Sequence, residues 1–343
     1  YGFQTVTKKM EMMDAYEFVC YQIERTPSSV DTYLNSLDRT LEDYKRMGQG
    51  IDWQDKLFQN APLHMHNLSL SGGTKQTKYS VSLSMADQEG VIICSGYEKY
   101  QGRISLTQQL NKRAKLQVNA SYTSDKTYGQ TSSAALSSSN AYASYLMYRT
   151  WAFRPVITNT SSLDEELFDD EFDGNNSAVM NPIISSQNED KVTRKQTFLS
   201  NAKIDYNLHK NLRLSVSGGY TRYTYLSTEF NNSYTYKGYP TLTNTKGVNG
   251  SVLNRERSNW MNENTLTYTK NWKNGRHKLN AVAGFTLEGA RDKRFGFSAM
   301  NVPNESLGIS GLDDGLPDTT TAQISENYLM SWLGRVNYSY RSR

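Results

Sequence analysis

The feature that most constrains this chain is a period-two alternation of apolar and polar residues, which extends from His66 to Ser124. In residues 79–85, for example, every second residue is apolar and the residues between them are serines. Successive side chains of a β-strand point to opposite faces, so this pattern predicts strands with one apolar and one polar face. Turn sequences such as GGTKQTK divide the segment into four strands, arranged as two hairpins.

Two architectures produce such alternation, and they place the apolar face in opposite environments. A soluble sandwich or barrel turns the apolar face toward a dry core. A transmembrane barrel turns it outward to lipid and keeps a polar lumen. In the transmembrane case, the residues predicted to face lipid are Leu68, Leu70, Tyr79, Val81, Leu83, Leu116, Val118, Leu214 and Val216. The residues predicted to face the lumen are Ser80, Ser82, Asn119, Ser215 and Ser217.

Composition removes several other classes of protein. Only 37% of the 343 residues are hydrophobic, and no apolar run is long enough for a spanning helix, which excludes a helical membrane protein. The net charge of +4 is spread along the chain, and no basic and aromatic patch indicates a nucleic acid partner. The 24 tyrosines suit both strands and the aromatic girdles at membrane interfaces.

The connections between strands alternate between short and long. Short turns are predicted near Gln76, Lys112, Lys210 and Asn274. Long connections are predicted over residues 7–65, 125–195, 227–257 and 298–325. Outer-membrane barrels place tight turns at one rim and long loops at the other, and their tilted strands have about ten residues. We therefore predict an all-β fold of about ten antiparallel strands, beginning with Tyr1–Val6, that form part of a large transmembrane barrel.

The connection over residues 7–65 departs from the strand pattern. Apolar residues at three- and four-residue spacing predict a helix over Lys9–Arg25. After the break at Pro27, a second helix is predicted from about Asp31 to Met47, ending at Gly48. The connection is therefore expected to be a structured, helical extracellular loop.

Few residues carry recognisable chemistry. The four histidines show no catalytic arrangement, so no enzyme and no cofactor are expected. A calcium loop beginning at Asp169 fails because Met180 stands where the closing Glu belongs, and a solvated acidic loop is the favoured interpretation. No metal site is predicted. Cys20 and Cys94 fit either a disulfide or two unpaired thiols, and the second is favoured.

Aromatic residues in the long loops are the candidate contacts for a ligand or a partner protein. Four of them recur at three-residue steps, and Trp53 adds a fifth: Tyr142, Tyr145, Tyr148, Trp151 and Trp53. An aromatic face can hold sugar rings or apolar peptide side chains. The competing interpretation, which is favoured, is that these rings pack the loops against their surroundings and that Trp53 is a structural anchor.

Several motifs resemble one known family. The run DWQD at Asp52–Asp55, the Ala61–Pro62 step, and the segments HNLSLSGG, TKYSVSLS and DQEGVI resemble the hallmark region of SusC/RagA-type TonB-linked outer-membrane transporters. GYEKYQGRISL is similar to the next strand of the family, although Lys99 stands where Arg is common. The NPI at residues 181–183 also matches, so the resemblance covers nearly the whole chain.

The resemblance implies a 22-stranded barrel, of which this chain is the N-terminal portion. It also implies a plug domain that fills the lumen, coupling to TonB–ExbB–ExbD, and a SusD-like lipoprotein lid. The plug and the remaining strands are expected to lie outside this sequence. The implied location is the outer membrane of a Gram-negative bacterium.

Three functions remain open at this point. The first is active, TonB-dependent import of a glycan or a peptide, with the sequence giving no choice between the two ligands. The second is a passive channel or surface-binding barrel without energy coupling. A soluble carbohydrate-binding sandwich is the third and least favoured.

Overall fold

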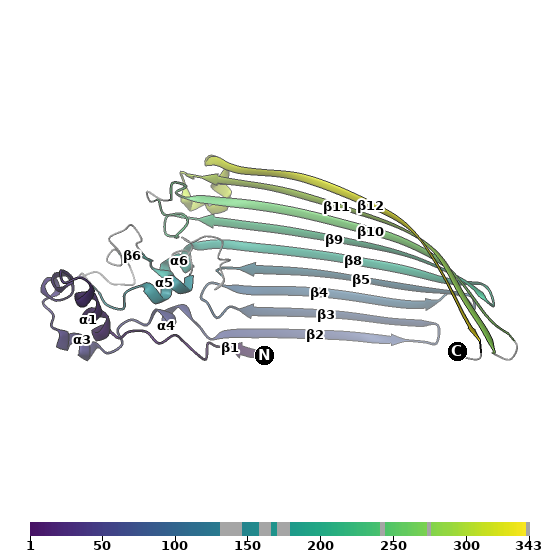
Figure 1. Ribbon diagram of the computed structural model, residues 1–343, viewed down its shortest axis with the longest axis horizontal. Coiled ribbons are helices and arrows are strands. Elements are labelled where there is room, and N and C mark those ends of the chain that lie inside the picture. The colour runs from purple at the N-terminus through teal and green to yellow at the C-terminus, as the bar shows by residue number, and fades with distance from the viewer. Residues whose placement is uncertain (131–145, 158–165, 170–178, 241–243, 273–275, 341–343) are drawn as a thin grey trace.

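One antiparallel sheet makes up most of the molecule. The computed structural model describes the whole chain except residues 131–145, 158–165, 170–178, 241–243, 273–275 and 341–343. Ten strands form the sheet in the order β1-β2-β3-β4-β5-β8-β9-β10-β11-β12, and β6 pairs with β7 in a separate small sheet (Figure 1). The predicted number of strands and their antiparallel pairing are confirmed. The main strands are β1 Gly2–Gln4, β2 Ala61–Gly73, β3 Thr77–Glu89, β4 Gly96–Gln109, β5 Ala114–Tyr128, β8 Glu189–His209, β9 Leu212–Asn231, β10 Asn249–Trp272, β11 His277–Met300 and β12 Leu316–Tyr340.

The register of the strands places the apolar residues on a single face. Val81 pairs with Ile104, and Ile104 pairs with Ala120. Paired residues point to the same side of a sheet, so the period-two pattern of each strand is kept in phase across all of them. This face carries Leu68, Leu70, Val81, Leu83, Ile104, Val118, Ile204, Val216, Leu266, Phe285 and Trp332.

The opposite face is lined by polar side chains that bond to one another across the strands. Ser105 Oγ donates a hydrogen bond of 2.6 Å to Asn119 Oδ1, and Asn119 Nδ2 donates one of 3.0 Å to Asn201 Oδ1. These three residues come from neighbouring strands in one register row. The polar residues that alternate with the apolar ones therefore form a hydrogen-bonding surface across neighbouring strands.

The apolar face is exposed, which is the reverse of a soluble core. On β9, Val216 is 36% exposed, whereas its neighbour Ser215 is only 9% exposed. Leu68 and Leu70 on β2 are more than 60% exposed. Within the described residues no second sheet covers these side chains, so a sandwich packed on this face is not the fold.

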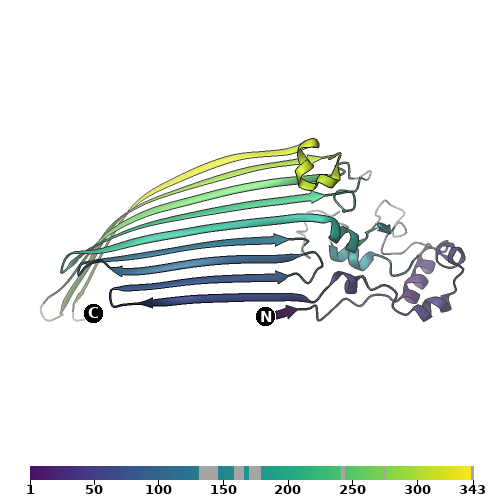
Figure 2. The same cartoon turned by 180° about the vertical axis from the view of Figure 1, so that it is seen from behind.

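The connections separate by length as predicted. The tight turns after β2, β4 and β8 lie at one end of the sheet, which we call the short-turn end, and all the helices lie at the other (Figures 1 and 2). All four long connections are shorter than predicted. β2 starts at Ala61, and β8 starts at Glu189 after β5 runs to Tyr128. β9 runs to Asn231, β10 starts at Asn249, and β12 starts at Leu316. The predicted loops over 227–257 and 298–325 are thus too long. Polar residues there continue the ladder, as the Arg255↔Arg294 pair illustrates.

The helices of the first connection differ from the predicted ones because of their capping residues. Helix α1 spans Ala15–Arg25 and not Lys9–Arg25, since Asp14 and Glu17 form a reciprocal capping box that fixes its start. The predicted second helix is divided into α2 (Ser29–Tyr33), a 3₁₀ turn (Asn35–Leu37) and α3 (Leu41–Met47). Asp38 adopts a left-handed conformation with φ 48°, which ends the 3₁₀ turn before α3 begins. Gly48 caps α3, as predicted.

Three further α-helices lie at this end, as does the 3₁₀ helix η3 (Glu305–Asp314) before β12. The α-helices are α4 (Trp53–Leu57), α5 (Leu146–Ala152) and α6 (Pro182–Asn188). We call the described residues of the two connections that hold α1–α6, 5–60 and 129–188, the helical cap.

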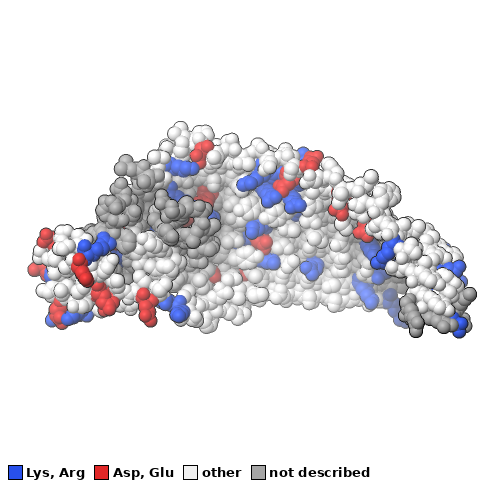
Figure 3. Space-filling view, in the orientation of Figure 1, with Lys and Arg blue, Asp and Glu red and all other residues white. Residues whose placement is uncertain are grey.

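Three buried apolar clusters of the described residues lie in the helical cap, around Tyr33 and Tyr44, around Trp53 and Phe153, and around Leu57 and Leu146. A fourth lies at the ends of β9 and β11, around Phe230 and Ala299. Charged side chains of both signs are scattered over the outer end of the cap (Figure 3). Among the described residues no helix is long and apolar enough to cross a membrane.

We predict that two glycines of the cap respond differently to alanine. Both have positive φ angles, +69° at Gly48 and +71° at Gly50, which L side chains rarely adopt, so each Gly→Ala change adds backbone strain. Only at Gly50 would the new Cβ collide, at 2.6 Å from Pro155 O. Gly50→Ala should therefore accelerate hydrogen exchange in α4 and residues 151–157 more than Gly48→Ala does. Equal exchange in the two variants would contradict this packing.

Candidate binding site in the helical cap

Trp53 is fixed by the local structure of α4. The Asp52 side chain caps this helix by accepting hydrogen bonds from the backbone N–H groups of Gln54 and Asp55. Trp53 is 4% exposed, and its Nε1 donates a hydrogen bond of 2.8 Å to Arg154 O. Its ring meets Phe153 edge-on, with centroids 4.9 Å apart. This geometry supports the interpretation of Trp53 as an anchor between the first connection and the segment after α5.

Gln54 joins three separate segments through one side-chain amide. Its Oε1 accepts hydrogen bonds from Met10 N at 3.0 Å and from Trp151 Nε1 at 3.3 Å. Its Nε2 donates a bond of 2.8 Å to Met10 O. The amide is buried, so these bonds hold the extended segment before α1 and the end of α5 against α4.

A cavity of about 220 Å³ lies where these segments meet, between α1, α4 and α5. Its walls are mainly sulfur-containing and aromatic: Met12, Met13, Phe18, Tyr21, Trp53 and Trp151. Trp151 is 37% exposed at the surface, whereas Trp53 lies deeper. Two residues predicted from sequence, separated by 98 positions in the numbering, are therefore brought to one site.

The other predicted residues do not contribute to this cavity. Tyr148 is half-buried on α5 and is not among the residues that line it. Tyr142 and Tyr145 lie outside the described residues. Sequence reasoning missed Met12 and Met13 as site residues, because it assigned them to the apolar face of a helix that in fact begins only at Ala15. The cluster of methionines at positions 10–13 was the available signal.

Arg154 corrects the prediction of a solvated acidic loop at Glu166 and Asp169; the other acidic residues of that loop lie outside the described residues. Its side chain is only 4% exposed, and its Nη1 donates a hydrogen bond of 2.8 Å to Asp169 Oδ1. Its Nη2 pairs with Glu166, while its backbone N donates to Asp169 Oδ2 at 3.1 Å. Asp169 is 2% exposed. A buried guanidinium requires carboxylate partners, and these two acidic residues are buried with it instead of facing water.

A second buried arginine joins the cap to the rim of the sheet. Arg149 is 3% exposed, its Nη1 donates to Ser185 Oγ at 2.8 Å, and its guanidinium lies 5.5 Å from the centroid of the Tyr236 ring. Burial lowers the pKa of Arg149 to about 10, against the opposing effect of the nearby Glu189 carboxylate. The group therefore stays charged at neutral pH, which makes its contacts charge-assisted.

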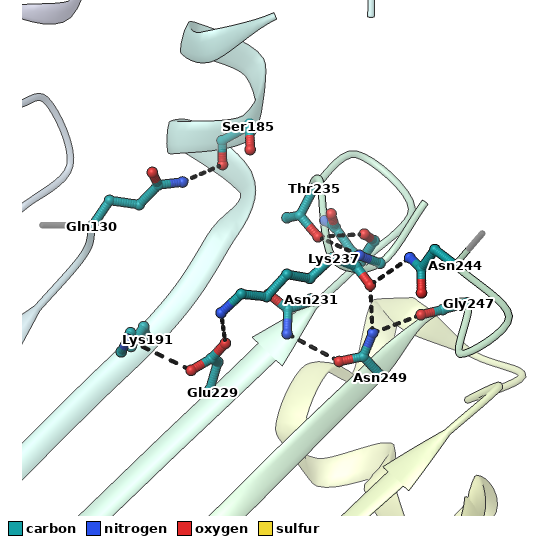
Figure 4. A network of polar contacts seen from close by, with 12 residues as sticks. Gln130, Ser185, Lys191, Glu229, Asn231, Thr235, Lys237, Asn244, Gly247 and Asn249 are labelled. Atoms are coloured by element: carbon teal, nitrogen blue, oxygen red, sulfur yellow. Dashed lines mark hydrogen bonds and ion pairs between the residues drawn. The ribbon is translucent and has the colours of Figure 1, made fainter. Parts of the chain in front are cut away.

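Beside this arginine, a polar network closes the connection between β9 and β10 (Figure 4). Glu229 lies between two lysines, at 2.5 Å from Lys237 Nζ and 3.6 Å from Lys191 Nζ. Asn249 Nδ2 donates hydrogen bonds of 2.7 Å to the carbonyl oxygens of Lys237 and Gly247. The loop is thus built against the strand ends by direct contacts.

The remaining reactive residues form no further site in the described part of the chain. The Tyr1 ring packs edge-on against His64 and His66, with centroids 5.2 and 5.6 Å away. No group of three or more metal-ligating side chains occurs among the residues that the structure describes. Cys20 and Cys94 are free thiols.

Known proteins are similar to this chain in both sequence and fold. The TonB-dependent receptor P26 of Formosa agariphila is 26% identical over 299 residues, which cover 85% of this chain and 28% of the receptor. The TonB-dependent receptor SusC of Bacteroides thetaiotaomicron is 25% identical over 309 residues, covering 85% of this chain and 29% of SusC. The resemblance to SusC/RagA-type transporters is confirmed. No family model matches the chain.

Solved structures agree at the level of the fold. The RagAB peptide transporter superposes with a TM-score of 0.69 at 17% identity, and the match covers 99% of this chain and 40% of that one. The open–open state of the RagAB peptide importer gives a TM-score of 0.71. The chain thus spans less than a third of each of the two curated receptors and has the fold of a SusC/RagA-type barrel segment.

We predict that the buried and the exposed ion pairs differ strongly in their contribution to local stability. Asp169→Asn removes one carboxylate from the buried Arg154 and should lower the free energy of local opening of the cap by roughly 3–5 kcal/mol. Glu256→Gln, which removes the partner of the exposed Arg222, should cost no more than about 1 kcal/mol. Hydrogen exchange of the amides around each pair measures both values. Similar losses in the two variants would refute the buried role of Asp169.

Proposed function

We propose that this chain is the N-terminal portion of the barrel of an outer-membrane importer in a Gram-negative bacterium, driven by TonB. The observation that carries the proposal is the exposed apolar face of the sheet. On β12, for example, the band between Tyr328 and Tyr338 contains only Met330, Trp332, Gly334 and Val336 on this face. On strands inside the sheet, Ile104 of β4 is 54% exposed and Leu266 of β10 is 39% exposed. Lipid is the environment that accepts such a surface.

The height of this band supports a membrane crossing. The stretch from Tyr328 to Tyr338 spans about ten residues, and strands rise ~3.3 Å per residue. With a strand tilt of about 40°, the band is about 25 Å tall, which matches the apolar band of an outer-membrane barrel.

Aromatic residues at the short-turn side of the band follow the slope that tilted strands require. They are Tyr79 on β3, Tyr206 on β8, Tyr268 on β10 and Tyr338 on β12. When paired residues are followed from β3 to β12, each tyrosine lies closer to the short-turn end than the partner of the one before it, by about one residue per strand. If these tyrosines lie at one height in the membrane, such a shift between strands 4.8 Å apart corresponds to a strand tilt of about 40°. These residues therefore suit an interfacial aromatic girdle.

The remaining features of the importer are proposed for the whole protein. Open sheet edges leave unsatisfied backbone groups in lipid, so further strands would close the barrel, and the resemblance implies 22 in all. A plug domain outside this chain would fill the lumen and contact TonB–ExbB–ExbD. The helical cap would lie on the extracellular side, where a SusD-like lipoprotein lid would cover it. Both a glycan and a peptide stay open as ligands; one solved structure of similar fold is a peptide transporter. We propose no catalytic activity.

The alternative is a passive channel or surface-binding barrel, and energy dependence separates it from an importer. Accumulation of labelled oligosaccharides and oligopeptides should be measured in cells that carry the complete protein, with and without TonB. An importer should lose accumulation of its ligand when TonB is deleted or when the proton gradient is dissipated. Uptake that persists at the same rate in both cases would establish passive passage.

Sidedness gives an independent prediction. The Cys20→Ser/Cys94→Ser background removes the native thiols, of which Cys94 is exposed. In that background, Tyr234→Cys places a thiol at a residue that is 50% exposed in the loop between β9 and β10. Lys112→Cys places one in the exposed turn between β4 and β5. A membrane-impermeant maleimide should label only the first in intact cells and both after lysis. Labelling of only the second in intact cells would invert the topology.

A further inference from the structure

Three arginines and one aspartate form a square block on the polar face of β10 and β11. Arg255 and Arg257 are two positions apart on β10, so their side chains point to the same side of the sheet. The register pairs Arg255 with Arg294 and Arg257 with Asp292 on β11. Leu266 lies on the apolar face of β10 at an even-numbered position, which places the block on the opposite, polar face. Basic side chains gather over this part of the two strands (Figure 3).

The charges within the block do not balance. The Arg255 guanidinium is paired with the Asp292 carboxylate, and its Nε donates a hydrogen bond of 2.9 Å to Oδ1. Arg257 Nε donates to the neutral Asn259 Oδ1 at 3.3 Å. In the part of the chain that the structure describes, neither Arg257 nor Arg294 forms an ion pair. Like charges directly opposite each other destabilise a ladder, so the Arg255↔Arg294 pair has an electrostatic cost that a bound anion would remove.

The surface around the block is neutral and rich in hydrogen-bond donors. On its β9 side the paired residues are Tyr223 and Tyr225, and on its β12 side they are Gln323 and Ser325. None of these four side chains is negatively charged at neutral pH, and each can donate a hydrogen bond. The three arginine side chains are exposed and planar, and guanidinium groups bind carboxylates through two parallel hydrogen bonds. The block therefore fits an oxyanion better than a neutral or a cationic group.

The block lies between the lipid-facing band and the helical cap. A row of paired residues, Trp260, Gly289 and Tyr328, marks the cap-side end of the apolar band. On β10 the block begins at Arg257, about 10 Å beyond Trp260 along a strand. The polar face at this level lies beyond the membrane-spanning part of the sheet and faces water. A ligand that enters the lumen from the cap end passes these side chains.

We propose that this arginine block binds an oxyanion of the transported ligand, so that the importer takes a carboxylate-bearing oligomer in preference to a neutral one. Arg257 and Arg294 are the groups that contact the ligand, while Arg255 remains paired with Asp292. This inference rests on the proposed function and adds the charge of its substrate. A uronic acid and an acidic peptide present the same carboxylate chemistry, and the experiment separates these two sources.

Binding to the purified complete protein tests the proposal with two matched pairs of probes. One pair is an oligogalacturonate and its methyl ester, and the other is a glutamate-containing peptide and its glutamine counterpart. In one pair the acidic member should bind at least about 10-fold more tightly than the neutral member, and that pair identifies the ligand as glycan or peptide. The preference should decrease as salt is raised, because exposed charges are screened. Equal binding of the acidic and neutral members in both pairs would overturn the proposal.

Charge-removing variants locate the site. Arg257→Gln together with Arg294→Gln should reduce the preference for the acidic probe about 10-fold, because both unpaired guanidinium groups are lost. The matched control is Lys293→Gln together with Arg222→Gln, which removes two positive charges from the apolar-facing side of β11 and β9. This control should leave the preference unchanged. An equal loss in the two double variants, or no loss in the first, would contradict the assignment.

Asp292→Asn provides a test in the opposite direction. It frees Arg255 and removes the one carboxylate of the block, so the preference for the acidic probe should increase. If the arginines instead pair with acidic residues of the plug, loss of Arg257 and Arg294 would accelerate hydrogen exchange in the plug and leave the preference intact, which would also overturn the proposal. Binding by the purified protein does not require TonB, so this result is independent of the test of energy coupling.

Discussion

The register of the antiparallel ladder is the constraint on which the rest of the structure depends. Each strand alternates between apolar and polar residues, but only a fixed register keeps the apolar residues of all strands on one face. A slip of one residue would place Val81 beside Arg103 and interrupt the bonds between Ser105, Asn119 and Asn201. The short turns hold this register, while the exposed apolar face and the polar face are its two consequences.

The helical cap is held by a different kind of interaction, namely buried polar contacts between distant segments. Arg154 pairs with Glu166 and Asp169, Arg149 bonds to Ser185, and Gln54 clamps Met10 and Trp151. The arginine contacts lie within the connection between β5 and β8, and the Gln54–Trp151 contact joins that connection to the one before β2. Because buried polar groups are costly unless they are satisfied, these contacts specify one arrangement of otherwise irregular segments. A preformed cavity beside Trp151 is the result.

Sequence predicted the sheet better than it predicted the cap, for a physical reason. Period-two alternation is a local signal, and it identified the strands and the side on which the helices lie. Helix boundaries depended on single residues, such as the Asp14 capping box and the left-handed Asp38. The predicted loops were too long because polar residues near Glu256 remain in the ladder. The sequence identified Trp53 and Trp151 as aromatic candidates. It did not predict the burial of Asp169, because that burial depends on pairing with Arg154, which no local pattern reveals.

The most direct test of the membrane-facing sheet is the environment of two neighbouring side chains on β3. Spin labels would be attached at Leu83→Cys or Ser82→Cys in the complete protein, without its native cysteines, in a lipid bilayer. Collisions with oxygen report lipid, and collisions with a water-soluble nickel complex report water. The structure predicts that the label at position 83 is accessible to oxygen and the label at 82 is not lipid-exposed. Accessibility to nickel at 83 together with oxygen at 82 would contradict the barrel orientation.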